Sequence, residues 1–153
     1  MKRHLPKGFT LVELLIVITV IAILAALVLN TAGYVQEKGA RSRAESEIAA
    51  ISAALESYKA DNGDYPTGTN TANTSSGNNN FLYTNLCPPS GKVYFEFSKG
   101  MTNGTPTSIV DPFGNAYGYQ YPGNPNRSGT NFFDLWSSAN KPVTNSNAWI
   151  KNW

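Results

Sequence analysis

The sequence predicts an α+β fold in which a long N-terminal α-helix packs on a small antiparallel β-sheet with long loops. Three observations predict it. An apolar run from Phe9 to Leu29 continues into a segment with the apolar period of a helix. Short segments of alternating aromatic residues, separated by turn residues, follow in the second half of the chain. Between them, residues 67–80 are almost all Thr, Asn, Ser and Gly, a composition that favours a loop.

The apolar run contains one acidic residue, Glu13, and no other charge. From Phe9 to Leu29 it has the ~20 residues that a helix needs to cross a bilayer. An acidic group near the centre of a membrane helix costs about 2.5 to 3.5 kcal/mol, so Glu13 is expected to have a partner. If the chain is cut between Gly8 and Phe9, the new α-amino group lies one helical turn before Glu13. We predict that this amine pairs with Glu13, on the same chain or on a neighbouring one.

The segment before the apolar run, residues 1–8, is predicted to be a leader peptide. It contains Lys2, Arg3 and Lys7 and no acidic residue, a charge pattern that places it on the cytoplasmic side of a membrane. The apolar run is longer than the about 7–15 residues of an ordinary secretory signal. An uncleaved signal anchor is the alternative interpretation, but it gives no account of Glu13.

The helix is predicted to continue beyond the apolar run. Residues 9–29 form its transmembrane half in this interpretation, and residues 30–62 form its amphipathic half. The amphipathic half has one apolar stripe at helical spacing, which consists of Ile48, Ile51, Leu55 and Tyr58. Gly63 and Pro66 predict the end of the helix, because glycine accepts the left-handed cap conformation and proline cannot continue a helix.

Residues 63–153 are predicted to form a globular β domain. Strands are expected at Lys92–Phe97, Tyr117–Tyr121 and Phe132–Trp136, where apolar and other residues alternate or β-favouring residues gather. The run Asp111–Asn115 predicts a tight turn that leads into the second of these strands. One face of the sheet is expected to pack on the apolar stripe of the helix.

Four segments resemble one known family. Residues 7–18, Lys-Gly-Phe-Thr-Leu-Val-Glu-Leu-Leu-Ile-Val-Ile, resemble the class III signal of type IV pilins and of type II secretion pseudopilins. Tyr58–Thr67, Asp111–Gly123 and Phe132–Ser138 resemble segments of the major pseudopilin of type II secretion. The resemblance implies the type IV pilin fold.

The same resemblance implies roles for three residues and a set of partners. A prepilin peptidase, which is also a methyltransferase, is expected to cut between Gly8 and Phe9 and to methylate the amine of Phe9. Glu13 is expected to pair with that amine in a homopolymer built through the N-terminal helices. An inner-membrane assembly platform and minor pseudopilins are the further partners. The chain is then expected to cross the bacterial inner membrane once, with its N-terminus cytoplasmic before cleavage and its C-terminal domain in the periplasm.

The resemblance implies a structural function, and three versions of it remain open. The preferred one is a major pseudopilin that polymerises into a periplasmic pseudopilus and drives protein export by a type II secretion system. A major or minor pilin of a type IV pilus, for adhesion, motility or DNA uptake, is the alternative. A membrane-anchored periplasmic binding module that does not polymerise is the second alternative. Cys87 is the only cysteine, which excludes an intrachain disulfide and favours the pseudopilin, because many type IV pilins join two cysteines near the C-terminus.

The chain departs from the major pseudopilins at one place. These proteins usually hold calcium in an acidic, glycine-rich loop, but the corresponding loop here, Ala139–Asn147, contains neither an acid nor a glycine. The residues whose oxygens are candidates for calcium are Asp134, Ser137, Asn145 and Asn147. Only Asp134 among them is charged. Without calcium, the three tryptophans Trp136, Trp149 and Trp153 are expected to hold the loop by packing.

The sequence gives no support to an enzyme or to a nucleic-acid-binding protein. The one histidine, His4, lies in the predicted leader, and no glycine-rich phosphate-binding signature is present. Loss of the leader removes three basic side chains and leaves nine Lys and Arg against ten Asp and Glu. A chain without a basic excess is a poor candidate for binding phosphate backbones.

Overall fold

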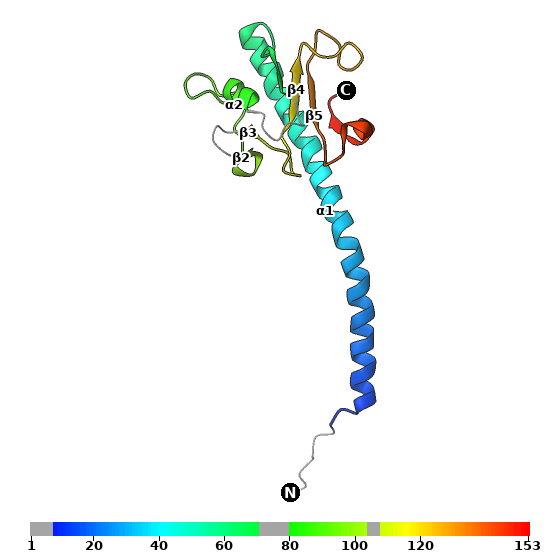
Figure 1. Ribbon diagram of the computed structural model, residues 1–153. Coiled ribbons are helices and arrows are strands. Elements are labelled where there is room, and N and C mark those ends of the chain that lie inside the picture. The colour runs from blue at the N-terminus through cyan, green and yellow to red at the C-terminus, as the bar shows by residue number, and fades with distance from the viewer. Residues whose placement is uncertain (1–7, 71–79, 104–107) are drawn as a thin grey trace. The chain divides into compact units, whose positions relative to one another are not determined.

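The computed structural model describes residues 8–70, 80–103 and 108–153, without the side chains of residues 28–32, 69, 70 and 80. The chain divides into two compact units, Met1–Lys38 and Gly39–Trp153. The boundary between the units falls inside helix α1, Leu11–Asn62 (Figure 1). Residues 1–7 of the predicted leader and most of the Thr/Asn/Ser/Gly stretch, at residues 71–79, lie outside the described residues.

In the first unit, the apolar side chains of α1 are exposed. The large apolar residues from Leu11 to Leu27 expose between 49% and 79% of their surface. Across the part of the chain that the structure describes, no helix has both the length and the apolar character that crossing a membrane requires. The predicted span, residues 9–29, includes Val28 and Leu29, whose side chains lie outside that part.

The C-terminal end of α1 follows the sequence prediction. Asn62 is the last helical residue, and Gly63 adopts the left-handed conformation with φ of 87°. The Gly63 N–H donates to the Lys59 carbonyl at 2.8 Å, which satisfies one of the last helical carbonyls. Gly63 therefore ends the helix because it tolerates a backbone conformation that a side chain opposes.

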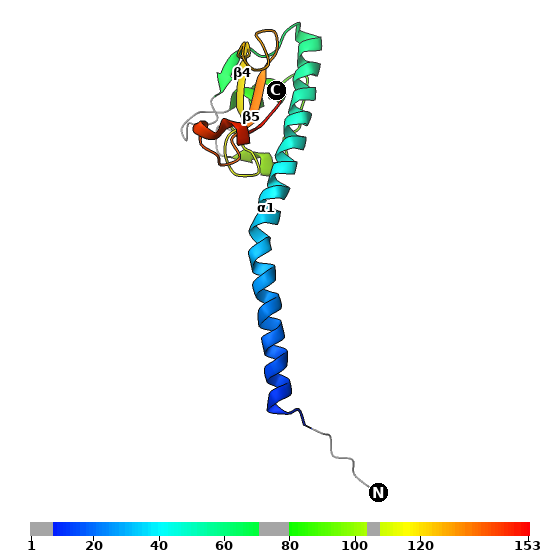
Figure 2. The ribbon, with the colours of Figure 1, turned by 90° about the vertical axis from the view of Figure 1, so that its right-hand side faces the viewer.

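The second unit contains two antiparallel sheets. The larger one has the strand order β1-β4-β5-β6, and the smaller one joins β2 to β3. The strands are β1 Gly68–Asn70, β2 Thr102–Asn103, β3 Ser108–Ile109, β4 Gly118–Tyr121, β5 Asp134–Ser137 and β6 Ile150–Lys151. The other elements in the described part of this unit are helix α2, Asn80–Leu86, and the 3₁₀ helices η1, Lys99–Met101, and η2, Val143–Ala148. Figure 2 shows β4 and β5 alongside the C-terminal part of α1.

The core of this unit lies between α1 and the larger sheet. The apolar stripe is confirmed, since Ile48, Ile51 and Leu55 are at most 4% exposed and Tyr58 packs against the same cluster. The sheet and its flanks supply buried aromatic and aliphatic side chains to the cluster: Tyr117, Tyr119, Phe133, Leu135 and Ile150. The α+β fold predicted from the sequence is therefore confirmed.

Tyrosine hydroxyls connect the domain to acidic residues of α1 and of the turn that follows it. The Tyr117 hydroxyl donates to Glu47 at 2.6 Å, and the Tyr121 hydroxyl donates to Asp64 at 2.6 Å. The Tyr65 hydroxyl donates to Glu56 at 2.8 Å. Burial raises the pKa of the Tyr117 hydroxyl, with a further contribution from Glu47, so this group stays protonated and remains a donor.

The predicted strand at Lys92–Phe97 is wrong. Among the described residues this segment pairs with no strand, because the N–H groups of Tyr94 and Phe95 both donate to the Leu86 carbonyl, at 2.8 and 3.1 Å. Its aromatic side chains pack on the core without a sheet ladder. The sequence analysis also missed α2, the short strands β2, β3 and β6, and β1 in the polar stretch that was predicted to be a loop.

We expect Ile51→Ala to lower the free energy of unfolding of the second unit by about 2–5 kcal/mol, because the side chain is fully buried. Urea unfolding of the full chain in detergent micelles, followed by tryptophan fluorescence, measures the change. Val93→Ala is the control, since Val93 is 44% exposed and its truncation should cost about 0.5 kcal/mol or less. Equal losses in the two variants would contradict the position of the core.

Candidate functional site

The N-terminal end of α1 is closed by a reciprocal pair, Thr10 and Glu13. The Thr10 N–H and the Thr10 hydroxyl both donate to Oε2 of Glu13, each at 2.8 Å. The Glu13 N–H donates back to the Thr10 hydroxyl oxygen at 3.2 Å. Thr10 immediately precedes the first helical residue, and Glu13 is the third residue of the helix. This is a capping box, in which two backbone N–H groups that the helix leaves unpaired find side-chain partners.

The capping box gives Glu13 a partner that the sequence analysis missed. The signal was present, because Thr-x-x-Glu before an apolar run is the signature of a capping box. In the chain as described, the nitrogen of Phe9 belongs to a peptide bond with Gly8 and carries no charge. An ion pair between Phe9 and Glu13 therefore requires the cleavage predicted above.

The two residues of the predicted cleavage site are accessible. Phe9 exposes 84% of its surface, and a side-chain atom added to Gly8 would meet nothing within 4 Å. Both residues lie before the first residue of α1, so their backbone is not part of the helix. An exposed backbone outside regular secondary structure fits the entry of a peptidase.

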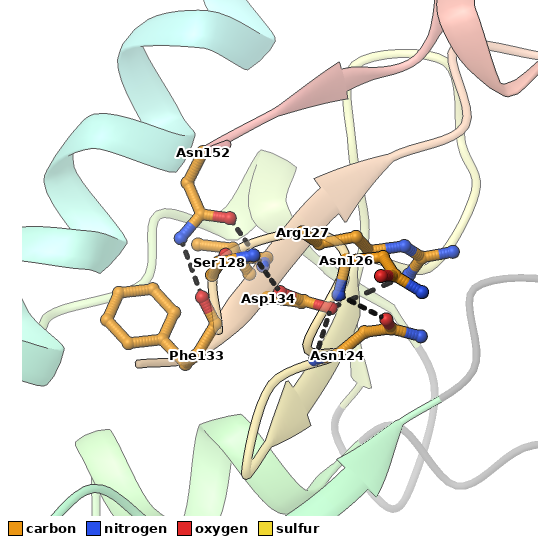
Figure 3. A network of polar contacts seen from close by, with 8 residues as sticks. Asn124, Asn126, Arg127, Ser128, Phe133, Asp134 and Asn152 are labelled. Atoms are coloured by element: carbon orange, nitrogen blue, oxygen red, sulfur yellow. Dashed lines mark hydrogen bonds and ion pairs between the residues drawn. The ribbon is translucent and has the colours of Figure 1, made fainter. Parts of the chain in front are cut away.

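The predicted calcium residue Asp134 lies in a different environment, at the start of β5. Its side chain is fully buried, and its two oxygens accept the N–H groups of Ser128 and Asn124 at 3.2 and 3.1 Å. Arg127 lies 3.6 Å from Oδ2 of Asp134 and forms an ion pair with it. Figure 3 shows these donors gathered around the carboxylate from the 124–128 turn. Asp134 thus organises that turn.

Ser137, at the other end of β5, belongs to a second network. Its hydroxyl donates to Oδ2 of Asp111 at 2.5 Å and accepts the Ala139 N–H at 3.1 Å. The other oxygen of Asp111 accepts the N–H groups of Phe113 and Asn115 and closes the predicted tight turn. Burial raises the pKa of Asp111, although these hydrogen bonds oppose the shift.

The four residues proposed for calcium are not brought together. Asp134 and Ser137 are three positions apart on one strand and so face opposite sides of the sheet. Asn145 and Asn147 are exposed in η2. Calcium takes six to eight oxygen ligands, which come from carboxylates, carbonyl groups and water. The described residues contain no cluster of three His, Cys, Asp or Glu side chains able to hold a metal ion. This arrangement does not fit a calcium ion.

The fold and the N-terminal segment together define a class of protein. A helix that begins as an exposed apolar rod with a single acid and ends against a small antiparallel sheet is the architecture of pilin-like subunits. Comparison with family models agrees. Residues 3–29 match the prokaryotic N-terminal methylation motif, and residues 32–153 match protein G of the type II secretion system. The chain belongs to the type II secretion system protein G family, the major pseudopilins.

Curated relatives support the same assignment along the whole chain. The type II secretion system core protein G of Klebsiella michiganensis is 31% identical over 153 residues, which is all of this chain and 96% of the relative. That of Pseudomonas aeruginosa is also 31% identical, over all of this chain and 99% of the relative. That of Vibrio cholerae is 32% identical over 99% of this chain and 94% of the relative. No solved structure matches the chain. The chain is a structural subunit and not an enzyme.

We expect Thr10→Ala to lower the free energy of opening of the first turn of α1 by about 1 kcal/mol, because the capping hydroxyl is lost. Amide hydrogen exchange of the Glu13 N–H in the uncleaved chain should then accelerate about fivefold, the rate ratio that this free energy sets. Thr10→Ser should retain the slow exchange. Thr19→Ala is the matched control, since its hydroxyl donates to the Leu15 carbonyl within the helix and caps nothing. Equal exchange rates of the Glu13 N–H in Thr10→Ala and in the unmodified chain would refute the capping role.

Proposed function

We propose that this major pseudopilin is processed and assembled through its first residues. The leader, residues 1–8, is removed after Gly8, and the new amine of Phe9 is methylated by the same enzyme. Residues 9–29 then anchor the chain in the bacterial inner membrane, with residues 63–153 in the periplasm. The observation that carries this proposal is the exposed apolar surface of α1 with its single acid at the start.

Polymerisation through the N-terminal helices keeps this apolar surface out of water when the subunit leaves the membrane. In a homopolymer built through the N-terminal helices, each helix exchanges contacts with lipid for contacts with identical helices. Lipid tails are as apolar as leucine, so packing and polar pairs rather than the hydrophobic effect must drive this exchange. An acid with a specific cationic partner is therefore the natural determinant of the axial register.

Glu13 has the capacity to serve the helix cap and the assembly contact together. An ionised carboxylate has about four lone-pair sites, and both donors of Thr10 use the same oxygen, Oε2. Oε1 remains for the methylated amine of Phe9 on a neighbouring subunit. The capping box also fixes the side-chain orientation of Glu13, which reduces the entropy lost when the ion pair forms.

The proposed partners follow the steps of this pathway. The methylation motif supports processing by a prepilin peptidase, and membership of the protein G family supports assembly into a pseudopilus. An inner-membrane assembly platform would receive the subunits, and minor pseudopilins would initiate the fibre. The family match favours secretion over the alternatives considered from the sequence, a surface type IV pilus and a non-polymerising anchored module.

The test is a replacement of Glu13 by Gln in a strain that lacks the native gene. We expect normal amounts of subunit in the membrane, loss of the leader, and retention of the secreted proteins inside the cell. The physical reason is that a neutral amide cannot balance the charge of the Phe9 amine. Glu45→Gln, at an exposed position of α1, is the control and should secrete normally.

Mass spectrometry of the purified subunit separates the steps. The mass of the purified subunit should correspond to a chain that lacks residues Met1–Gly8 and carries one added methyl group. An intact leader would refute the processing step and support a plain anchor. Normal secretion by Glu13→Gln would refute the ion pair, and lost motility with normal secretion in the deletion strain would indicate a type IV pilus instead.

A further inference from the structure

The C-terminal loop of the domain is bounded by stacked tryptophans. Trp136 in β5 and Trp149 before β6 lie parallel, with ring centroids 6.1 Å apart and planes at 4°. Trp153 meets Trp136 edge to face, with centroids 6.0 Å apart. These rings join the two ends of the loop, Ala139–Asn147, and the last residue of the chain. We call Trp136, Trp149, Trp153 and Arg127 the tryptophan clamp.

Arg127 brings a positive charge to two rings of the clamp, and Lys151 lies 5.3 Å from the centroid of the Trp153 ring as well. The Arg127 guanidinium lies 4.9 Å from the ring centroid of Trp153 and 5.6 Å from that of Trp136. Both distances are within the range in which a cation is attracted to the face of an aromatic ring. The same guanidinium forms the ion pair with the buried Asp134. The Arg127 guanidinium therefore lies beside Asp134, the carboxylate that the sequence analysis predicted as a calcium ligand.

The packing of β4 fixes the position of the clamp. Gly118 in β4 lies opposite Trp136 in β5, and the indole covers it so closely that an added Cβ would lie 2.1 Å from the ring. Only glycine leaves this space for the indole. Trp136 is consequently held from the sheet side as well as from the loop side.

Hydrogen bonds within the domain close the loop at several points. The Trp149 indole N–H donates to the Lys141 carbonyl at 3.1 Å, and the Lys141 N–H donates to the Ser138 carbonyl at 2.8 Å. Arg41 of α1 donates to the Ala148 carbonyl at 3.0 Å. The Asn115 side chain donates to the Asn140 side-chain oxygen at 2.7 Å. The loop thus has direct protein partners at both of its ends.

We propose that the tryptophan clamp holds the C-terminal loop of this pseudopilin in its folded conformation without calcium. The loop contains no carboxylate, and Asp134 is enclosed by two backbone N–H groups and Arg127. A divalent cation at Asp134 would have to displace the guanidinium and these amides. The proposal concerns folding of the domain and does not depend on the ion pair of Glu13.

The test is thermal unfolding of the full chain in detergent micelles, followed by tryptophan fluorescence. The chain has three tryptophans, and all three are in the clamp, so the signal reports this region alone. We expect the same melting temperature in millimolar CaCl₂, in MgCl₂ of equal ionic strength and in EDTA. A calcium site filled at a hundred times its Kd would raise the melting temperature by on the order of 10 °C, and such a calcium-specific shift would overturn the proposal.

Variants test the clamp itself. Trp149→Ala and Arg127→Ala should both expose the loop to limited proteolysis in calcium and in EDTA alike. Trp149→Ala should also lower the melting temperature by on the order of 10 °C, because a large buried ring is lost. Val143→Ala, in the same segment and 61% exposed, is the control and should leave both measurements unchanged. Unchanged protease resistance in Trp149→Ala and Arg127→Ala would overturn the proposal. Slower proteolysis of either variant in calcium than in EDTA would also overturn the proposal.

Discussion

The domain depends on the packing of one helical stripe against one aromatic face. Ile48, Ile51 and Leu55 project from α1 at helical spacing, and the buried rings of Tyr117, Tyr119 and Phe133 meet them. Strands of two to four residues cannot form a stable sheet alone, and a two-stranded hairpin is marginal in water. The helix therefore serves as the surface on which the sheet is built, and the loops are placed by the sheet in turn.

The N-terminal part of the same helix is subject to an opposite requirement. Its apolar side chains are exposed in the isolated chain and have no core of their own to enter. An exposed apolar surface of this kind is favourable only where lipid or other protein covers it, as proposed above for the membrane and the fibre. Thr10 and Glu13 keep the end of the helix intact in either surrounding, since the capping box satisfies the backbone locally.

Periodic and local features were predictable from the sequence, and contacts between distant segments were not. The stripe at Ile48 and the helix end at Gly63 follow from spacing and backbone preference alone. The segment Lys92–Phe97 alternates like a strand, but the Leu86 carbonyl captures its N–H groups, which no pattern reveals. β1 lies in a stretch without apolar residues and forms only because β4 offers it a partner.

The same difference between local features and distant contacts holds for the candidate site. The roles of Gly8, Phe9 and Glu13 were predicted from a local motif and stay predictions, whereas the Thr10 cap was missed although its signature is equally local. The tryptophans were expected to hold the C-terminal loop, but Arg127 was not. Its role depends on the turn around Asp134, which brings the guanidinium to rings 9 and 26 positions away in the chain.

The tyrosine–carboxylate contacts have a mechanical consequence. Tyr117 reaches Glu47 near the start of the domain's part of α1, whereas Tyr121 reaches Asp64 just beyond the end of that helix. Sliding the sheet along the helix axis would have to stretch both attachments at the same moment, together with the apolar layer between them. Load applied to the helix is thereby shared among widely spaced anchor points, and the sheet and the helix move as one body.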